Sequence, residues 1–580
     1  MPCVSSMTEV SGPSHLPNNS EDILASIDRE TIMHAVEIFQ QRFTMFSFLH
    51  GPTLLSLIYG EGPLDLRFCG ILALCARFIP KLVERYNGPL PASEHFAAYL
   101  RCRITCQAAN GQEISVAQAL LLLSFHDWGA AKGGQAWTYI GMATRNCSTI
   151  LARLSSQKTQ RSSTPSLVHQ TKVEEARRTL WACLMIEALL GCGYLRSLSL
   201  HAKIYNVPLP ASDEDFAFSV YHADDTKYLE VLDLESSDPP KIQKLGGKEG
   251  EIDFAMIIQG FNIWCEVSRF VSSGANREEA PAQIEGASNT DSFWSRSLVA
   301  LESWRATQPP RMHFSIAESH LQAFISRKQG ERYALVNLIY FLTTIFLYRE
   351  HIPLPMFRNP KQMEESESAF FREGVPTDWW KESAKVLSRS ACSIIEMMKK
   401  LTSQGIDLQV PFTCYCVFNA TTVLSFVKRW SAMDCEQEGA PEFFDWGFEW
   451  LSRASDTWEV ARAWKATLMK IESSYGSPQP GLEGSAQLQA GMESLSNLPL
   501  AAGWHGFTRQ LELDQDTTSG GNLFAQQDLT TLGDFSFTAQ PDLPWLSMGD
   551  ISLDYGLMAD AQYDITGVPV NFHQSRVPED

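Results

Sequence analysis

Three segments between residues 114 and 210 decide the fold class of this 580-residue chain. Residues 114–147 read ISVAQALLLLSFHDWGAAKGGQAWTYIGMATRNC, residues 174–198 read EEARRTLWACLMIEALLGCGYLRSL, and residues 207–210 read VPLP. The two long segments carry apolar residues at helical spacing and lack the alternation of a strand. We therefore predict an apolar helix, a second helix entered through the stretch GGQAW, and a third that carries a pair of arginines and a tryptophan.

Each of the two later helices has an apolar stripe along one side. In the helix after Trp137, Arg145 lies opposite the stripe, which consists of Ile140, Thr144, Cys147 and Leu151. In the following helix, Glu174 and Arg178 stand four residues apart, which is the spacing of a helical ion pair. The stripe of that helix consists of Val173, Ala176, Leu180, Leu184 and Ala188.

Glu187 is a polar residue on this last apolar stripe. An ionised carboxylate buried there needs a partner, because an unpaired buried charge is costly. Arg145 and Arg177 are the candidate partners. In the alternative, Glu187 lies at the edge of the helix packing and keeps its carboxylate in water.

The helical pattern extends over most of the chain. It dominates residues 27–219 and returns in the segments 254–270, 293–304, 331–348, 384–401, 412–430 and 443–471. The polar stretches 222–250 and 272–291 are typical of loops. We therefore predict an all-α fold, with a large helical domain over residues 26–475 between a disordered N-terminal tail, residues 1–25, and a disordered C-terminal tail, residues 476–580.

The most apolar segment, Tyr333–Tyr348, reads YALVNLIYFLTTIFLY. It is shorter than the roughly 20 residues that a membrane-spanning helix needs, and it contains Asn337 and two threonines. It therefore predicts a buried central helix and no membrane span.

The charge of the chain is negative and unevenly distributed. The net charge is −20, and the residues after Gly476 include 14 acidic and 2 basic ones, so this tail carries −12 of it. Binding to phosphates needs clustered lysine and arginine. The balance therefore argues against broad, non-specific attraction to nucleic acid.

The cysteines and histidines form no metal or catalytic motif. No CxxC pair occurs, and the polar N-terminus lacks the apolar core of a signal peptide, so we expect reduced, mostly buried thiols. Cys102 and Cys106 have a helical spacing that can clamp a metal, but without a second pair we predict two buried core thiols and no metal or cofactor. No nucleophile motif accompanies His126-Asp127, which we interpret as a helix-end histidine beside an N-cap aspartate. We predict no catalytic residue and no enzymatic activity.

Short motifs occur in a fixed order along the chain. FQQRF (39–43), FSFLHGPTL (46–54) and a small-residue helix (64–77) precede the quoted stretch, and YFLTTIFLYR (340–349) follows it. Together they resemble the fungal-specific transcription factor domain, the middle homology region of fungal zinc-cluster regulators, over about residues 30–430. The resemblance implies a helical regulatory domain whose signature residues here are Trp137, Gly141, Ala143, Arg145, Arg177, Arg178, Trp181 and Glu187.

The sequence departs from this family in two places. The family commonly has an Asp-Arg step and a Gly-x-Pro turn after the Arg-Arg-Trp helix, where this chain has Glu187-Ala188 and Gly191-Cys192-Gly193. The family usually begins with a binuclear zinc cluster held by six cysteines beside a basic loop. Before residue 60 this chain has only Cys3, and its first lysine is Lys81. We therefore expect no zinc cluster and no direct DNA binding from this chain.

The acidic tail interleaves carboxylates with large apolar side chains. This composition is typical of activation segments, in which the acids keep apolar anchors solvated until they enter a coactivator groove. The candidate anchors are Phe535, Phe537, Trp545, Leu546, Leu553 and Tyr555. The alternative is a solvating tail without a partner.

The resemblance implies a transcriptional regulator located in the nucleus, with the cytoplasm as the alternative. It would act through a DNA-bound transcription factor or a coactivator, as a homo- or heterodimer, and control a metabolic or secondary-metabolite gene cluster; this last point is an analogy with the family alone. The alternative hypothesis is a helical domain that senses a small-molecule effector, or a degenerate enzyme, without a direct transcriptional role. Activation by the tail without ligand would favour the first hypothesis, and a ligand-dependent thermal shift without reporter activation the second.

Overall fold

The computed structural model describes ten stretches of the chain, all of them within Met1–Gly520, one of the two units into which the chain divides. These are residues 23–110, 113–160, 166–192, 206–221, 227–229, 252–273, 292–314, 318–349, 377–428 and 439–475. The predicted C-terminal tail, with its six candidate anchors, lies outside the described residues. So do nearly all of the predicted N-terminal tail and of the two predicted loops.

The described residues are helical, and they contain no β-strand beyond one isolated bridge between Pro208 and Tyr228. The prediction of an all-α fold is confirmed. The α-helices are α1 (Arg29–Arg42), α2 (Gly51–Tyr59), α3 (Leu66–Cys75), α4 (Pro80–Arg85), α5 (Pro89–Asn110), α6 (Ile114–Gly129), α7 (Gly133–Gln160), α8 (Leu167–Gly191), α9 (Asp213–Phe218), α10 (Phe254–Ser273), α11 (Phe293–Thr307), α12 (Glu318–Ser326), α13 (Gly330–Arg349), α15 (Thr377–Ser403), α16 (Pro411–Val427), α17 (Ala440–Ala454) and α18 (Glu459–Tyr475). Three short 3-10 helices are η1 (Ile23–Ser26), η2 (Ala76–Phe78) and η6 (Pro310–Met312).

Several helices begin at a residue whose side chain accepts a hydrogen bond from the first turn. Asp28 accepts from the Thr31 amide at 2.8 Å at the start of α1. Ser212 accepts from the Asp215 amide at 3.0 Å at the start of α9. Such caps satisfy backbone donors that have no partner within the helix, so short polar side chains fix where these helices begin.

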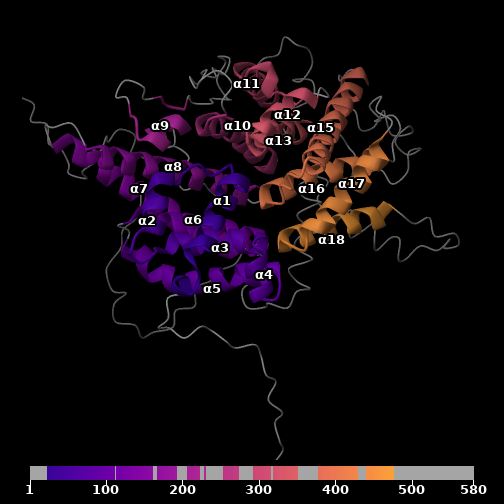
Figure 1. Ribbon diagram of the computed structural model, residues 1–580. Coiled ribbons are helices and arrows are strands. Elements are labelled where there is room, and N and C mark those ends of the chain that lie inside the picture. The colour runs from indigo at the N-terminus through magenta and orange to yellow at the C-terminus, as the bar shows by residue number, and fades with distance from the viewer. Residues whose placement is uncertain are drawn as a thin grey trace, which may run out of the picture. The chain divides into compact units, whose positions relative to one another are not determined.

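Helix α6 is the central helix of the N-terminal part. It contacts α3, α5, α7 and α8, and every residue from Val116 to Asp127 is buried. Figure 1 shows these helices gathered on one side of the molecule, in indigo and purple. Because α6 is surrounded, its sequence is apolar on all sides rather than along one stripe.

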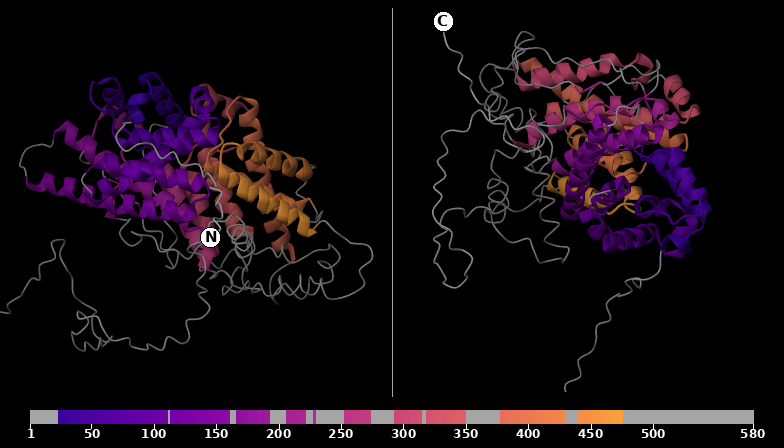
Figure 2. Two further views of the ribbon diagram at one scale, coloured as in Figure 1. Left: turned by 90° about the horizontal axis from the view of Figure 1, so that it is seen from below. Right: turned by 90° about the vertical axis from the view of Figure 1, so that its left-hand side faces the viewer.

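Helix α13 has the same role in the C-terminal part. It contacts α10, α11, α12, α15 and α16, and its residues from Tyr333 to Ile339 are all buried. Figures 1 and 2 show it among the magenta and orange helices. None of the described helices has both the length and the apolar character needed to cross a bilayer. The prediction of a buried central helix in this segment is confirmed.

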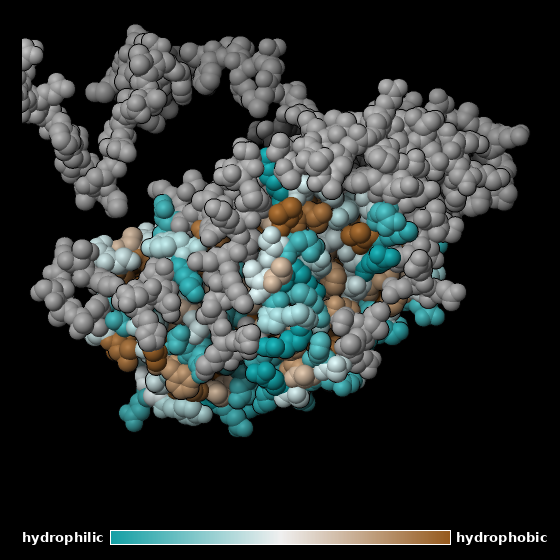
Figure 3. All heavy atoms as spheres, turned by 90° about the horizontal axis from the view of Figure 1, so that it is seen from above, coloured by the Kyte–Doolittle hydropathy of each residue, from teal (hydrophilic) through white to brown (hydrophobic). Residues whose placement is uncertain are grey.

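Helix α18 connects the two parts through its contact with α6. The indole of Trp458, just before α18, lies against Gly129 at the end of α6. A Cβ atom at Gly129 would come within 2.3 Å of that ring, so this close approach requires glycine. The surface shown in Figure 3 carries small apolar areas separated by polar side chains.

Candidate functional site

The signature arginine Arg178 lies inside the molecule, with none of its surface exposed. Helix α8 carries it on the side that faces the start of α9 and the segment between α1 and α2. Its Nε donates to Glu174 Oε1 at 3.0 Å, one helical turn earlier. The predicted ion pair between residues four apart is therefore confirmed. The guanidinium also lies 4.2 Å from the ring centroid of Phe216, a cation–π distance.

The two terminal nitrogens of Arg178 reach two other segments. Nη1 donates to the carbonyl oxygen of Ser47 at 2.8 Å and to Asp213 Oδ1 at 2.6 Å. Nη2 donates to the carbonyl oxygens of Ala211 at 2.6 Å and Ser212 at 3.1 Å. All three nitrogens of the guanidinium are thus used, which is the condition under which a buried charge is tolerated.

The two carboxylates beside Arg178 have further partners of their own. Glu174 accepts from the Ala211 amide at 2.9 Å and from Arg177 Nη1 at 2.5 Å. Asp213 accepts from Arg332 Nη1 of α13 at 2.5 Å. Burial raises the pKa of Asp213, but the charges and hydrogen bonds of Arg332 and Arg178 outweigh this effect, so its pKa lies below the usual range.

We call this set the Arg178 cluster. Its members are Ser47, Glu174, Arg177, Arg178, Ala211, Ser212, Asp213 and Arg332. It joins the segment before α2 to α8, to the start of α9 and to α13, which lie far apart in the sequence. Its charged groups hold one another, so the arrangement fixes these segments relative to one another.

Trp181 extends this junction by one turn of α8. Its indole is 1% exposed, and Nε1 donates to the carbonyl oxygen of Pro208 at 2.9 Å. The quoted motif VPLP is thereby attached to α8. The sequence placed Trp181 among the signature residues, but it gave no sign of this hydrogen bond.

The signature residues of α7 lie elsewhere. Ala143 is buried and Trp137 is partly buried against the core. Arg145 is exposed, as its position opposite the stripe predicted, and its Nη1 lies 3.4 Å from the carbonyl oxygen of Gly141. The signature residues of α8 are therefore mostly buried, whereas those of α7 range from buried to exposed.

Glu187 is buried, with 1% of its surface exposed. The alternative that placed its carboxylate in water at a packing edge is therefore wrong. Arg177, one of its two candidate partners, instead pairs with Glu174 at 2.5 Å, and Arg145, the other, lies on the exposed side of α7.

A second polar cluster behind α8 was not predicted. Arg67 of α3 donates to Asp65 Oδ2 at 2.8 Å, to Gln118 Oε1 at 3.0 Å and to Glu175 Oε1 at 3.1 Å. Gln118 in turn donates to Thr179 Oγ1 at 3.1 Å. The sequence did carry a signal for this cluster: Arg67, Gln118 and Glu175 are polar residues within helices that are otherwise largely apolar. Buried polar groups require partners, so such residues could have been expected to meet.

The interpretation of Asp127 as an N-cap is wrong. Asp127 lies within α6, whereas the next helix begins at Gly133. Its carboxylate is fully buried and accepts from Arg101 and from His126 Nδ1, the latter at 3.0 Å. Burial lowers the pKa of His126, although the hydrogen bond to Asp127 opposes this effect. A buried carboxylate requires a charged donor such as Arg101, which a cap position would not have supplied.

The prediction that Cys102 and Cys106 are buried core thiols is also wrong. Both are exposed on α5. Their neighbour Ile104 lies half a turn away and is fully buried, so the two thiols occupy the outer face of the helix. Within the described stretches, no group of three or more histidine, cysteine, aspartate or glutamate residues could hold a metal ion.

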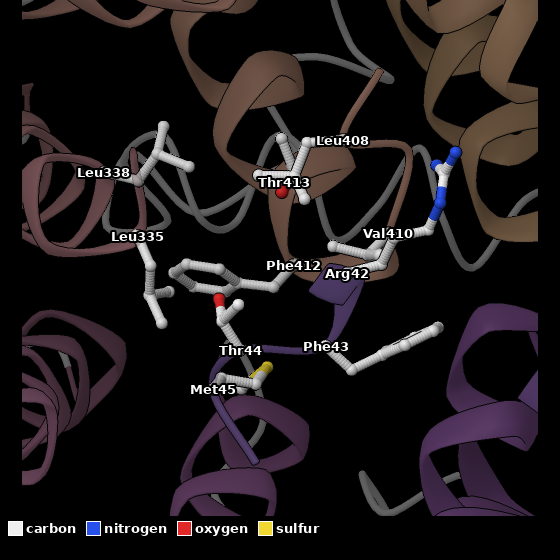
Figure 4. Close-up of a pocket in the computed structure, with 10 residues that line it drawn as sticks. All are labelled: Arg42, Phe43, Thr44, Met45, Leu335, Leu338, Leu408, Val410, Phe412 and Thr413. Carbon is white, nitrogen blue, oxygen red and sulfur yellow. The ribbon is translucent and has the colours of Figure 1, made fainter. Parts of the chain in front are cut away.

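A small apolar pocket lies between the segment after α1, helix α13 and the start of α16 (Figure 4). Its cavity volume is about 10 Å³. The guanidinium of Arg42 is turned away from it in Figure 4, and its Nη1 donates to the carbonyl oxygen of Asp407 at 2.5 Å. The other lining residues are Phe43, Thr44, Met45, Leu335, Leu338, Leu408, Val410, Phe412 and Thr413.

Comparison with known proteins shows which family this part of the chain resembles. Residues 37–245 match the model of the fungal specific transcription factor domain, and this range includes both halves of the signature. YFLTTIFLYR, in α13, lies beyond the matched range. No solved structure matches the chain significantly.

Relatives that the chain resembles are fungal proteins. An uncharacterized transcriptional regulatory protein of Schizosaccharomyces pombe, PB1A11.04c, is 24% identical over 424 residues, which cover 70% of this chain and 59% of the relative. The Zn(2)-C6 fungal-type transcription factor FTF1c of Fusarium oxysporum f. sp. lycopersici is 22% identical over 434 residues, which cover 72% of this chain and 43% of that protein. The chain thus spans about half the length of these relatives. The chain is thus similar to fungal transcription regulators, and residues 37–245 are the part that matches the fungal specific transcription factor domain.

Proposed function

We propose that this chain is a fungal transcriptional regulator that acts in the nucleus through a DNA-bound partner. The observation that carries the proposal is the match of residues 37–245 to the fungal specific transcription factor domain. The names of the relatives from Schizosaccharomyces pombe and Fusarium oxysporum support it, since they describe a transcriptional regulatory protein and a transcription factor. Regulators of this kind are not enzymes.

The Arg178 cluster gives the domain a physical basis for a regulatory role. Glu174 and Arg178 are fully buried at its centre, and separating either from its partners would leave an uncompensated charge in the interior. The segments that it joins are therefore expected to stay attached, or to separate, as one cooperative unit. A partner that binds across α8, α9 and α13 would meet a preformed surface, at a low cost in conformational entropy.

We propose that residues 476–580 supply the activating function. The six anchors named above would enter an apolar groove of a coactivator, while Asp534, Asp542, Asp550 and Asp554 keep them solvated and steer them toward a groove with a basic rim. The anchors would therefore govern affinity, and the acids would govern the association rate and its dependence on salt.

Tethering the full chain to an unrelated DNA-binding domain tests this proposal. The fusion should activate a reporter in a fungal strain, and changing the six anchors to alanine should abolish activation. Changing the four aspartates to asparagine is the matched control and should reduce activation less. An inert fusion would overturn the activating role, and a specific footprint on duplex DNA by the purified chain alone would overturn the need for a partner.

The second candidate function, the sensing of a small apolar effector, would place that effector at the apolar pocket between α13 and α16. Its cavity of about 10 Å³ is far smaller than the roughly 300–1,000 Å³ typical of ligand pockets, so an effector would enter only if the lining side chains moved apart. A thermal shift with such a molecule, absent in Leu338→Trp and unaccompanied by reporter activation, would favour this role. In that case this chain would bind an effector without itself activating the target genes. Control of a metabolic or secondary-metabolite cluster, and assembly as a homo- or heterodimer, are further proposals that chromatin occupancy and sedimentation would test.

A further inference from the structure

The exposed thiols of α5 are set apart from the other cysteines of the described residues. Eight of the eleven cysteines there are buried and Cys192 is partly buried. Cys102 and Cys106 are exposed, and they stand one turn apart on the same helix face. Burial raises the pKa of buried thiols such as Cys147 and keeps reagents away from them. These two are therefore the accessible thiols of the described part of the chain.

The helix sets the distance between the two side chains. Residues four apart in an α-helix have Cβ atoms about 5–6 Å apart. A disulfide needs Cβ atoms about 3.5–4.5 Å apart. Helix α5 runs without a break from Pro89 to Asn110, so closing a disulfide between Cys102 and Cys106 would require this helix to deform.

A third atom between the two sulfurs removes this conflict. Two sulfur ligands at about 2.3 Å from a tetrahedral centre lie roughly 3.8 Å apart, far more than the S–S length of about 2.0 Å in a disulfide. Two thiols one turn apart can reach that separation by rotation of their side chains. The spacing of Cys102 and Cys106 thus disfavours direct oxidation and suits a bridging atom.

The surroundings limit which bridging atom can bind. Zinc in proteins takes four ligands, commonly cysteine and histidine, and no third ligand in the described stretches joins these two thiols. A trivalent arsenic compound of the type R–As=O needs only two thiols. Two As–S bonds form, the As=O bond breaks, and the oxygen leaves as water with the two thiol protons. Arsenic stays trivalent, so no oxidant or reductant is required.

We propose that Cys102 and Cys106 form a dithiol site on the outer face of α5 that binds trivalent arsenic compounds through both sulfurs. The proposal goes beyond the transcriptional role and does not depend on it. The site adjoins Arg101, which pairs with Asp127 of α6 and with Glu94 at 2.7 Å. Occupancy would therefore lie next to a polar cluster that joins α5 to the central helix.

Phenylarsine oxide and the full reduced chain provide the test. Intact-mass spectrometry under native conditions should show one phenylarsine per chain, and thiol titration should show two fewer reactive thiols. Cys102→Ser and Cys106→Ser should each abolish the adduct. Cys192→Ser is the matched control, since it removes the partly buried thiol and should leave the adduct unchanged. Because both target thiols are exposed, their serine variants should keep the wild-type circular dichroism spectrum and melting temperature.

Two results would overturn the proposal. One is an adduct that persists when Cys102 and Cys106 are both changed to serine, which would place the arsenic on other thiols. The other comes from oxidising the folded chain with diamide and mapping its peptides. An intact disulfide between Cys102 and Cys106, formed without loss of helical signal, would show that α5 lets the two sulfurs meet directly.

Discussion

Arg178 and Arg77 are both buried arginines that join distant segments, but they do so by different means. Arg178 lies between two carboxylates, Glu174 at 3.0 Å and Asp213 at 2.6 Å. Arg77 has no carboxylate of a described residue within ion-pair distance. Its guanidinium instead lies 3.5 Å from the ring centroid of Trp458, where the N-terminal helices meet the start of α18.

The remaining partners of Arg77 are neutral. Its donors reach Ser93 Oγ at 3.0 Å and the carbonyl oxygens of Thr457 and of Ala73, the last at 3.3 Å. Burial lowers the pKa of Arg77 to about 10, which still leaves it charged at neutral pH. Removing Arg178 would therefore leave two carboxylates without the cation between them. Removing Arg77 would leave only neutral acceptors without a donor.

Arg178→Glu should have the largest effect on stability. It removes the cation between Glu174 and Asp213 and adds a third carboxylate. Breaking a buried ion pair costs about 3–5 kcal/mol, and the reversed charge adds to this cost. Urea unfolding should show a free energy of unfolding lower by more than that range, or no folded protein. Arg145→Glu, on the exposed side of α7, is the control and should change the free energy by less than about 0.5 kcal/mol. Equal effects of the two variants would contradict a structural role for the Arg178 cluster.

Trp181→Ala should be nearly as damaging, because it empties a buried aromatic site. A change of this kind costs about 3–5 kcal/mol. Trp181→Phe keeps most of the buried area but loses the hydrogen bond to Pro208, which contributes about 0.5–1.5 kcal/mol. Denaturant melts of both variants check the expected order. Wild-type stability with loss of reporter activity would instead place Trp181 on a functional surface.

Arg77→Met should cost less, and the difference from Arg178→Met sharpens the comparison. Methionine can follow the path of the arginine side chain, and the change removes a buried charge that lacks a carboxylate. It leaves Ser93 and the Thr457 carbonyl oxygen without this donor, at about 1–3 kcal/mol. We expect Arg178→Met to lower the free energy of unfolding by at least about 1 kcal/mol more than Arg77→Met, because it leaves Glu174 and Asp213 without the cation between them. The reverse order, measured by urea unfolding, would show that the carboxylate partners of Arg178 do not make it the more important of the two arginines.

The smallest expected effect is a change in pH dependence. The pKa of Asp213 is lowered in the folded state, so its contribution to stability is complete above its unfolded value of about 3.9 and is lost as the pH falls through the folded value. Asp213→Asn should therefore show a shallower loss of stability below about pH 4 than the wild-type chain. Asp456→Asn, at an exposed aspartate, is the control. Unfolding midpoints should be measured between pH 5 and pH 3. If the midpoint changed with pH equally steeply in both variants, Asp213 would not be the source of the pH dependence.

The errors at Cys102 and Asp127 have a common physical origin. Cysteine counts as an apolar residue, so its spacing within α5 allowed the thiol pair to be placed on either face of the helix. An aspartate before Gly129 has the local sequence of a cap. In both cases the decision came from the neighbouring helices: α3 and α6 pack on the other face of α5, and Arg101 reaches Asp127 from α5.

The sequence by itself determined the all-α class, the apolar stripe of α7, the ion pair between Glu174 and Arg178, and the likeness to the fungal family. These features depend on spacing along one helix, where periodicity fixes which residues share a face. Only the tertiary structure decided that Arg178 meets Asp213, that Arg332 completes the cluster, and that Cys102 and Cys106 face outward. Those outcomes depend on which helices pack together, because a helical stripe shows that a face is buried and not what covers it.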